Sequence, residues 1–250
     1  MGESTASISL VERKKYDDKL AHQVVPGIWW IGYLEPESQT SHNPYLLVDG
    51  REGVLINPGS RADDLYRIVR DKASSVISPE QIQHIVVLHH DPERCASLPL
   101  FAKAAGRNVR IYAPARIARS IKHYGCKQPV IALGDGENII LKSGRSLAYH
   151  ETPQLPCAGS GILYDSLTGT CFSGNLLDCQ TKEWNLFAPP NAWDAPAPAK
   201  AEEKISKKAF LMALNKIERL SPERICPHCG PIIEEEIDNY LTAARNRAAG

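Results

Sequence analysis

The spacing of apolar residues in the first half of the chain predicts strands that alternate with helices. Apolar runs on both sides of Gly50-Arg51-Glu52 predict a hairpin. Ser78 followed by Pro79 indicates a short helix before the next strand. In chain order, the expected elements are a strand–turn–strand over 23–33, hairpin strands over 44–49 and 53–57, a helix over 62–73, a short helix over 79–81, a strand over 83–88, a helix over 96–105, a strand over 109–112 and a helix over 115–124.

The second half of the chain is richer in short strands set apart by Gly, Asp and Ser turns. The expected elements are strands over 131–133, 137–141, 147–151, 161–165 and 170–173, an irregular segment over 184–199, a helix over 202–220, a strand over 224–226 and a helix over 232–248. Two groups of strands, each followed by helices, predict an α/β fold in which two sheets pack face to face with helices outside, an αββα sandwich. We expect residues 1–20 to form an N-terminal arm and residues 21–250 a single domain.

The composition of the chain limits the kinds of partner and the cellular location that we expect. The 29 basic residues balance the 29 acidic ones, so charge points to neither nucleic acid nor membrane as a partner. No stretch reaches the roughly 18 apolar residues of a membrane span, and the polar N-terminus does not resemble a signal peptide. We therefore expect a cytoplasmic protein. Its seven cysteines are then expected to be reduced, as core residues, metal ligands or redox sites.

The strand expected over 83–88 ends in the segment His89-His90-Asp91-Pro92-Glu93-Arg94. If the chain stays extended, His89, Asp91 and Glu93 point to one side, because side chains of a strand alternate. Pro92 indicates that the strand stops being regular there. An imidazole and two carboxylates are a common set of metal ligands, so these three residues are candidate ligands. Arg94 stands where a further ligand is expected, and a guanidinium cannot coordinate a cation.

The order of elements and this segment resemble the metallo-β-lactamase superfamily, and within it the branch shared by flavodiiron proteins and oxygen-binding di-iron (ODP-like) proteins. The resemblance covers about residues 20 to 245. In that branch the first motif is His-x-Glu-x-Asp-His, followed by Ser-Gly-Ser-Leu-Pro or a near relative. This chain has Asp91 at the carboxylate position typical of the branch, and Ser97-Leu98-Pro99 follows. The resemblance implies a metal site at the edge between two sheets.

Several positions that carry ligands in this branch are substituted. Pro156 stands in place of a histidine, and Asn175 stands in place of a bridging aspartate. Cys229 stands in place of a second histidine, and His228 lies one position before it. Asn57 stands where the superfamily tends to carry an aspartate. The matching positions therefore leave His89, Asp91, Glu93, Asn175 and Cys229 as the candidate metal ligands.

Two irons need several anionic and imidazole ligands, and this set is too poor in both for a normal di-iron pair. Three arrangements stay open. In the first, Arg94 bridges Asp91 and Glu93 through forked hydrogen bonds, and the site is metal-free. In the second, one metal is bound by His89, Asp91 and either Cys229 or His228. In the third, shifted ligands restore two metals, and the histidines that could be recruited are His90 and His150.

The remaining cysteines and histidines have simpler interpretations. Cys157 and Cys229 could form a thiol-based redox module at the rim of the site, whereas Cys226 fits a buried strand position. Four histidines lie at the ends of expected elements and are predicted to be solvated: His22, His42, His84 and His123.

From the resemblance we expect a non-catalytic binding, sensing or scaffold protein related to di-iron proteins that handle O₂ or NO. Cofactors are expected to be none or, if any, iron or one zinc, with no flavin in this chain. If the chain is active, it is a metal-dependent oxidoreductase or hydrolase, and a mononuclear hydrolase is the main enzymatic alternative. A homo-oligomer or a signalling protein is the expected kind of partner.

Overall fold

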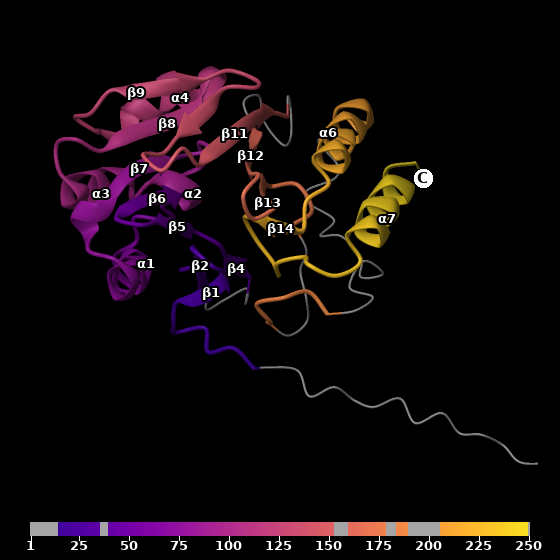
Figure 1. Cartoon of the computed structure of the whole chain (residues 1–250), viewed down its shortest axis with the longest axis horizontal. Helices are drawn as coiled ribbons and strands as arrows, with labels where there is room; N and C mark the ends of the chain where they lie inside the picture. The colour runs from indigo at the N-terminus through magenta and orange to yellow at the C-terminus, as the bar shows by residue number, and fades with distance from the viewer. Residues whose placement is uncertain (1–14, 36–39, 153–159, 179–183, 190–205, 250) are drawn as a thin grey trace, which may run out of the picture.

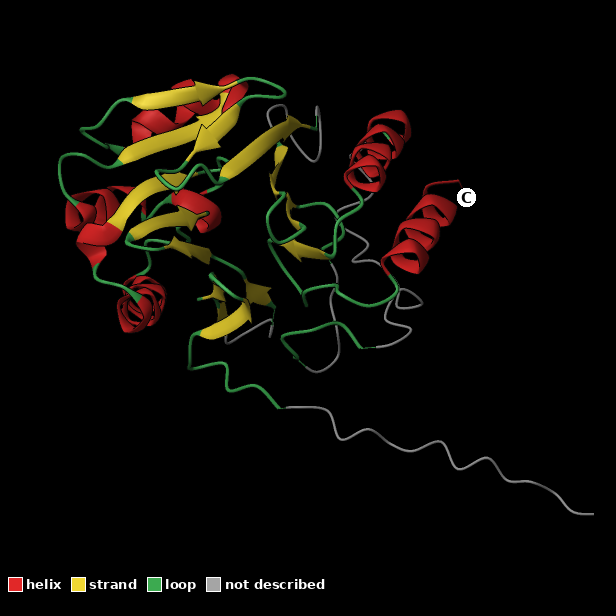
Figure 2. Cartoon of the chain, in the orientation of Figure 1, coloured by secondary structure: helices red, strands yellow, loops and turns green. Residues whose placement is uncertain are grey.

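The protein is known from a computed structural model, which describes residues 15–35, 40–152, 160–178, 184–189 and 206–249. Two β-sheets pack against each other, with helices α1, α3 and α4 outside one sheet and α6 and α7 outside the other (Figures 1 and 2). This four-layer arrangement is the expected αββα sandwich. No helix of the described residues is long and apolar enough to cross a membrane.

The first sheet has the strand order β1-β2-β5-β6-β7-β8-β9. Strands β6 to β9 run parallel, because helices connect them, and β1, β2, β5 and β6 pair antiparallel. The elements of this half are β1 (His22–Val25), β2 (Ile28–Trp30), β5 (Tyr45–Asp49), β6 (Glu52–Ile56), α1 (Asp63–Val76), η1 (Pro79–Gln81), β7 (Ile82–Val86), α2 (Pro92–Cys95), α3 (Leu98–Ala105), β8 (Arg110–Pro114), α4 (Ala115–Ile121), η2 (Lys122–Tyr124) and β9 (Val130–Leu133).

The second sheet has the order β10-β11-β12-β13-β14, and only its last pair, β13 with β14, is parallel. A separate two-stranded ribbon, β3 with β4, leads from the first sheet toward the second. The elements are β3 (Tyr33–Leu34), β4 (Ser41–His42), β10 (Asn138–Ile140), β11 (Ser146–Glu151), β12 (Gly161–Asp165), β13 (Thr170–Gly174), α6 (Lys207–Leu220), β14 (Arg224–Pro227) and α7 (Ile237–Ala249).

Three apolar clusters fill the spaces between the layers. The central cluster joins the two sheets and includes Trp30, Val86 and Phe172. A second cluster packs α1, α3 and α4 against the first sheet, and a third packs α6 and α7 against the second sheet. Burial of this apolar surface on both faces of each sheet is the main stabilisation of the fold.

The sequence prediction differs from the structure at the last helix and at a short ribbon. A helix was expected from residue 232, but Ile232 and Ile233 form β-bridges with Phe187 and Ile225, and α7 begins at Ile237. Both isoleucines are fully buried, and packing against the second sheet favours an extended backbone there. The β3–β4 ribbon was not predicted, because strands of two residues carry no recognisable periodicity.

The prediction that His84 is solvated is wrong. His84 lies inside β7 with 1% of its surface exposed, and its Nε2 lies 2.7 Å from Oε1 of Glu52. The other carboxylate oxygen of Glu52 accepts from the backbone N–H of Lys142, beyond the end of β10. Burial lowers the pKa of His84. This polar contact therefore ties the first sheet to the second, and the imidazole is neutral at pH 7.

Gly161, at the start of β12, leaves no room for a side chain. A Cβ atom built there would lie 2.1 Å from the ring of Tyr149, a core residue of β11. We expect Gly161→Ala to lower the free energy of unfolding by about 1 to 3 kcal/mol through overpacking. Urea denaturation measures this loss. Gly134→Ala is the matched control, because its Cβ would meet only Glu137 at 3.6 Å. An equal loss in both variants would contradict the packing argument.

Candidate functional site

The candidate residues converge because the carboxyl ends of two parallel strand pairs meet at one edge between the sheets. Asn57 follows β6 and His89 follows β7 in the first sheet, while Asn175 follows β13 and His228 follows β14 in the second. The backbone N–H of His228 donates to the carbonyl of Gly174 at the end of β13. Loops at the carboxyl ends of strands are where α/β folds usually bind ligands.

Asn43 joins the two sides of this edge. Its Oδ1 accepts from Nε1 of Trp30 at 2.8 Å, and its Nδ2 donates to the carbonyls of Pro227 (3.0 Å) and Gly230 (2.8 Å). The side chain is buried, and it ties β2 to the end of β14 and to the segment that follows. The neighbouring His42 pairs with Cys229 as an isolated β-bridge. His42 is therefore part of the site, and the prediction that it is solvated is wrong.

His89, His90 and Asp91 form one group of ligand-type atoms, which lie within 4.8 Å of one another. The rings of His89 and His90 stack with centroids 5.2 Å apart. Nδ1 of His89 lies 3.2 Å from Oδ2 of Asp91. Burial lowers the pKa of His89 to about 4, so this contact is not an ion pair at pH 7. The predicted pair His89 and Asp91 is thus brought together, with His90 as a third member.

Glu93 and Cys229 do not join that group among the described residues. The regular strand β7 ends at Val86, and the short helix α2 begins at Pro92. In a helix, successive side chains turn by about 100° instead of alternating. Glu93 is consequently exposed. In an extended chain its side chain would point to the same side as that of His89, but in this helix it does not.

Arg94 contacts the part of the site formed by β4 and the segment after β14. Its Nη1 lies 2.8 Å from Sγ of Cys229 and 3.3 Å from Nδ1 of His42, and its Nε is enclosed with no hydrogen-bond partner. No ion pair joins Arg94 to Asp91 or Glu93 among the described residues. The expected forked bridge between these two carboxylates is therefore wrong, because α2 turns the guanidinium toward β14 and β4.

Asp178 supplies negative charge near Arg94. Burial raises the pKa of the Asp178 carboxyl to about 7, although Arg94 and the backbone N–H of Cys229, which donates to its Oδ1 at 3.1 Å, oppose the rise. Burial also raises the pKa of the Cys229 thiol to about 12. Cys229 is therefore a neutral thiol at pH 7, and Asp178, which is partly ionised at that pH, offsets part of the Arg94 charge.

The protonation of His228 follows from its neighbours. Oδ1 of Asn57 accepts from the backbone N–H of Leu88 at 2.8 Å, which fixes the orientation of the amide. Nδ2 of Asn57 must then donate to Nδ1 of His228, 3.0 Å away. Burial, with the Arg94 charge, lowers the pKa of His228 well below its usual value. The neutral ring therefore carries its proton on Nε2, which is enclosed and has no partner.

Two of the sequence predictions fall outside the described residues, namely those on Pro156 and Cys157. Asn175 is half-buried, and its Oδ1 is enclosed without a hydrogen-bond partner.

Sequence reasoning missed Asp178 altogether. The only signal for it was a carboxylate three residues after Asn175, on the loop that leaves β13.

The described residues do not fit a di-iron centre. A metal pair needs two sets of ligands, but the described residues provide one group of three ligand-type side chains. On the other side of the site, Arg94 lies against Cys229, and the protonated Nε2 of His228 has no lone pair to offer a metal.

The raised pKa of Asp178 gives a test by pH. Because the folded chain binds this proton more tightly than the unfolded chain does, Asp178 favours folding less as pH rises from about 4 to about 7. We expect wild type to lose up to about 2 kcal/mol relative to Asp178→Asn over that range, after allowance for solvent screening. Denaturant titrations at several pH values measure the difference. Parallel curves for both proteins would contradict the assignment.

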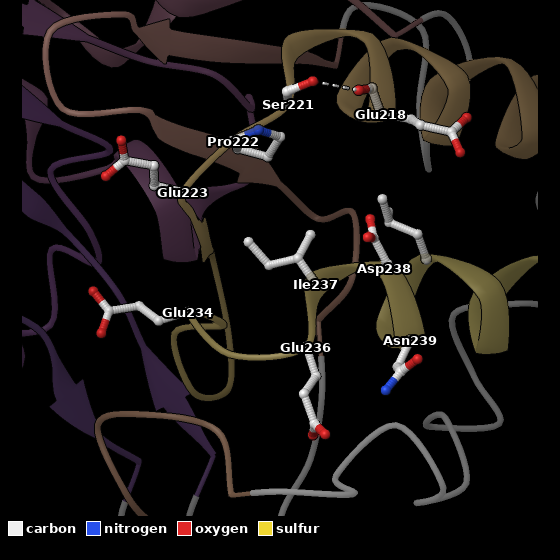
Figure 3. A pocket seen from close by; sticks show the side chains of 10 residues that line it. Glu218, Ser221, Pro222, Glu223, Glu234, Glu236, Ile237, Asp238 and Asn239 are labelled. Carbon is white, nitrogen blue, oxygen red and sulfur yellow. Dashed lines mark hydrogen bonds between the residues drawn. The ribbon is translucent and has the colours of Figure 1, made fainter.

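A hollow lies away from this site, where α6 ends and α7 begins (Figure 3). Its volume is about 600 Å³, and its lining includes five carboxylate side chains, Glu218, Glu223, Glu234, Glu236 and Asp238. Arg224 pairs with Glu234 at 2.9 Å, and Arg245 pairs with Glu218 at 2.6 Å. The hollow adjoins the start of β14, whereas His228 and Cys229 follow its end.

Comparison with known proteins agrees with this fold. A family model described as "ODP family beta lactamase" matches residues 40–230, more than half of the chain. Among curated proteins, the chain is similar to "Putative diflavin flavoprotein A 1" of Nostoc sp., with 25% identity over 214 residues. These residues make up 83% of this chain but 36% of that protein, so the chain spans about a third of this relative's length.

Solved structures share the fold. A mutant of a flavo di-iron protein from Thermotoga maritima has a TM-score of 0.77 at 19% identity, with 91% of this chain and 61% of that chain covered. The apo state of the chemotaxis sensor ODP from T. denticola has a TM-score of 0.74 at 23% identity, with 90% and 93% covered. Another structure of the chemotaxis sensor ODP is titled a peroxy diiron species. The chain belongs to the ODP family of β-lactamase-fold proteins.

Proposed function

We propose that this chain is a non-catalytic binding or sensing member of the ODP family, in which the Arg94 guanidinium supplies the positive charge that metal ions would supply in a di-iron protein. One observation carries the proposal. Nη1 of Arg94 lies 2.8 Å from Sγ of Cys229 and 3.3 Å from Nδ1 of His42. A permanent charge held at this place by short polar contacts leaves little electrostatic room for a cation.

The sensing part of the proposal rests on the relatives. One of them is named a chemotaxis sensor, and 90% of this chain aligns with 93% of it. The flavo di-iron and diflavin relatives are longer, and the 250 residues match only part of each. A binding role needs no reducing cofactor. A signalling protein or a second copy of the chain remains the proposed kind of partner.

Oxygen uptake tests the non-catalytic part. The full chain is supplied with ferrous iron and a chemical reductant, and O₂ consumption is followed beside Asp91→Ala and beside a solution without protein. We expect equal rates in all three, because only His89, His90 and Asp91 are grouped as ligands. A faster rate with wild type, lost in Asp91→Ala, would establish redox catalysis and overturn the proposal.

A mononuclear hydrolase is a second candidate, favoured by the group of His89, His90 and Asp91. Three protein ligands with an open fourth position could hold one zinc ion, which lowers the pKa of a bound water. Esterase and lactonase assays with added zinc test this candidate. Turnover in wild type that disappears in His90→Ala would support it, and no turnover in either would leave the metal-free account in place.

The thiol-based redox alternative has less support. A reactive cysteine needs a lowered pKa, whereas burial raises the pKa of Cys229 to about 12 and its proposed partner Cys157 lies outside the described residues. Cys226 is buried in β14, as its strand position predicted. A cytoplasmic location and the lack of a nucleic-acid partner stay predictions from the composition.

A further inference from the structure

Positive charge is concentrated in one part of the chain. The formal net charge is zero, yet residues 94–134 contain eight Lys or Arg residues and no Asp or Glu. Arg94 belongs to the candidate site, and Arg116 pairs with Glu151 at 2.5 Å. The other six, which we call the basic end, are exposed: Lys103, Arg107, Arg110, Arg119, Lys122 and Lys127. None of these six forms an ion pair with a carboxylate of the described residues.

The connections of the first sheet bring these six residues to one end of the fold. Strands β7, β8 and β9 are parallel, so α3 and α4, which connect them, each lead back to the amino end of the next strand. Lys103 lies in the last turn of α3, and Arg119 lies in the last turn of α4. The other four lie in η2, in the connections that follow α3 and η2, and at the first residue of β8. The candidate site lies at the carboxyl ends of strands, so the basic end is away from it.

Gln128 holds two parts of the basic end together. Its Nε2 donates to the carbonyl oxygens of Ala102 at 3.4 Å and of Gly106 at 3.1 Å, where α3 ends. Three residues of the basic end adjoin these residues in sequence, namely Lys103, Arg107 and Lys127. Like charges held close together repel one another, so the arrangement favours an anionic partner that offsets them.

The helix dipoles explain only part of this charge. A cation in the last turn stabilises a helix, which accounts for Lys103 and Arg119. It does not account for the basic residues in the connections or for the absence of acidic residues from 94–134. Glu80 lies on η1, which packs against α3, and it is exposed. One carboxylate leaves a clear excess of positive charge at this end of the fold.

The hollow between the end of α6 and the start of α7 carries the opposite charge (Figure 3). Its lining, which we call the acidic hollow, includes five carboxylate side chains and no Lys or Arg among the described residues. Glu223 lies 3.7 Å from Arg224, and no ion pair of Glu236 or Asp238 is present among the described residues. A concave surface of about 600 Å³ with unpaired carboxylates can receive protruding Lys and Arg side chains.

These two surfaces of one chain are complementary in charge, and other polyanions match the basic end less well. Single-stranded nucleic acid is usually held by stacking of its bases on exposed aromatic rings. Phe101 of α3 and Tyr112 of β8 are buried, and the hydroxyl of Tyr124 in η2 donates to the carbonyl of His90 at 2.7 Å. The carboxylates of a second copy need no such rings, because separate Lys and Arg side chains pair with them directly.

We propose that the chain associates with itself head to tail, with the basic end of one copy docked on the acidic hollow of the next. The basic end lies on the α3–α4 layer and the acidic hollow on the α6–α7 layer, which are opposite outer layers of the sandwich (Figure 1). The two faces of a contact therefore differ, so each copy presents one face to each neighbour. This proposal goes beyond the proposed function: it identifies the partner as a second copy, and it does not depend on the metal content of the candidate site.

Sedimentation velocity of the full chain at several protein concentrations tests the proposal. At about 20 mM salt we expect the mean mass of wild type to rise with concentration, and at about 500 mM salt we expect monomer, because salt screens exposed charges. Arg107→Glu with Lys127→Glu, and separately Glu223→Lys with Glu236→Lys, should each weaken association at least tenfold. Circular dichroism and thermal unfolding confirm that both variants are folded.

A mixture of the two variants gives the sharper result. Each variant keeps one unaltered face, so the mixture should form a 1:1 dimer that grows no further, although each variant alone is a monomer. Arg61→Glu with Arg67→Glu is the matched control, because both residues are exposed near the start of α1 and the change in net charge equals that of the basic-end variant. This control should associate as wild type does.

Three results would overturn the proposal. The first is a wild type that stays monomeric at low salt, and the second is a mixture of the two variants that stays monomeric. The third is equal association in the control and in Arg107→Glu with Lys127→Glu. If wild type is monomeric but binds a polyglutamate peptide or duplex DNA, and the basic-end variant does not, the surface serves another anionic partner and not a second copy.

Discussion

Arg94→Leu is expected to lower the free energy of unfolding by about 2 to 4 kcal/mol at pH 7. The substitution removes the hydrogen bonds to Cys229 and His42 and leaves Asp178 without its neighbouring positive charge. At pH 5 the cost should be smaller, because Asp178 is then protonated in the folded chain and needs no counter-charge. Urea denaturation at the two pH values measures both quantities.

A double-mutant cycle separates the charge effect from lost packing. An amide at position 178 needs no counter-charge, so Arg94→Leu with Asp178→Asn should recover the part of the loss at pH 7 that comes from the Asp178 charge. Arg70→Leu is the control for loss of an arginine from a helix surface, because Arg70 is only half-buried and its contacts are with Asp71 and the Tyr66 ring on its own helix. Additive losses in the double variant would show that Arg94 and Asp178 do not act together.

Asp165→Ala is expected to have the largest effect on stability, a loss of about 3 to 5 kcal/mol. Asp165 is fully buried at the end of β12, and it accepts hydrogen bonds from Nε of Arg145 at 3.0 Å and Nη2 at 2.5 Å. Thr168 also donates to the carboxylate at 2.5 Å. The substitution leaves the buried guanidinium unpaired. Thermal and urea unfolding of the variant measure the loss.

Lys216→Ala is the control for this ion-pair substitution. Lys216 pairs with Asp135 at 2.9 Å at the surface, where both side chains are partly exposed to water. Solvent screening limits such a pair to about 0 to 1 kcal/mol. Similar losses for Asp165→Ala and Lys216→Ala would contradict the argument from burial.

Hydrophobic periodicity was sufficient to predict the layers of the fold, because each strand and helix needed one apolar face. Periodicity failed to predict the local structure at positions where burial against a neighbouring sheet determines it. Ile232 and Ile233 continue a helical pattern in sequence, yet the second sheet holds them extended. His84 looked like a polar residue at a strand end, but its contact with Glu52 depends on the register between β6 and β7.

The site was predictable only in part, for a similar reason. His89 and Asp91 are close in sequence, so their proximity needed no knowledge of the fold. The partners of Arg94 are His42 and Cys229, at sequence distances of 52 and 135 residues, and only the meeting of the two sheets brings them together. The forked bridge to Asp91 and Glu93 assumed an extended chain, whereas Pro92 begins a helix that turns Arg94 the other way.

The most direct test of the account is elemental analysis of the purified full chain, expressed in medium supplemented with iron and zinc and compared with Asp91→Ala. The account predicts near-zero iron and zinc in both proteins, because the Arg94 guanidinium supplies the charge at the site and one group of three ligand-type residues is too few for a metal pair. Two irons per chain in wild type, lost in Asp91→Ala, would contradict it and restore di-iron chemistry to this member of the family.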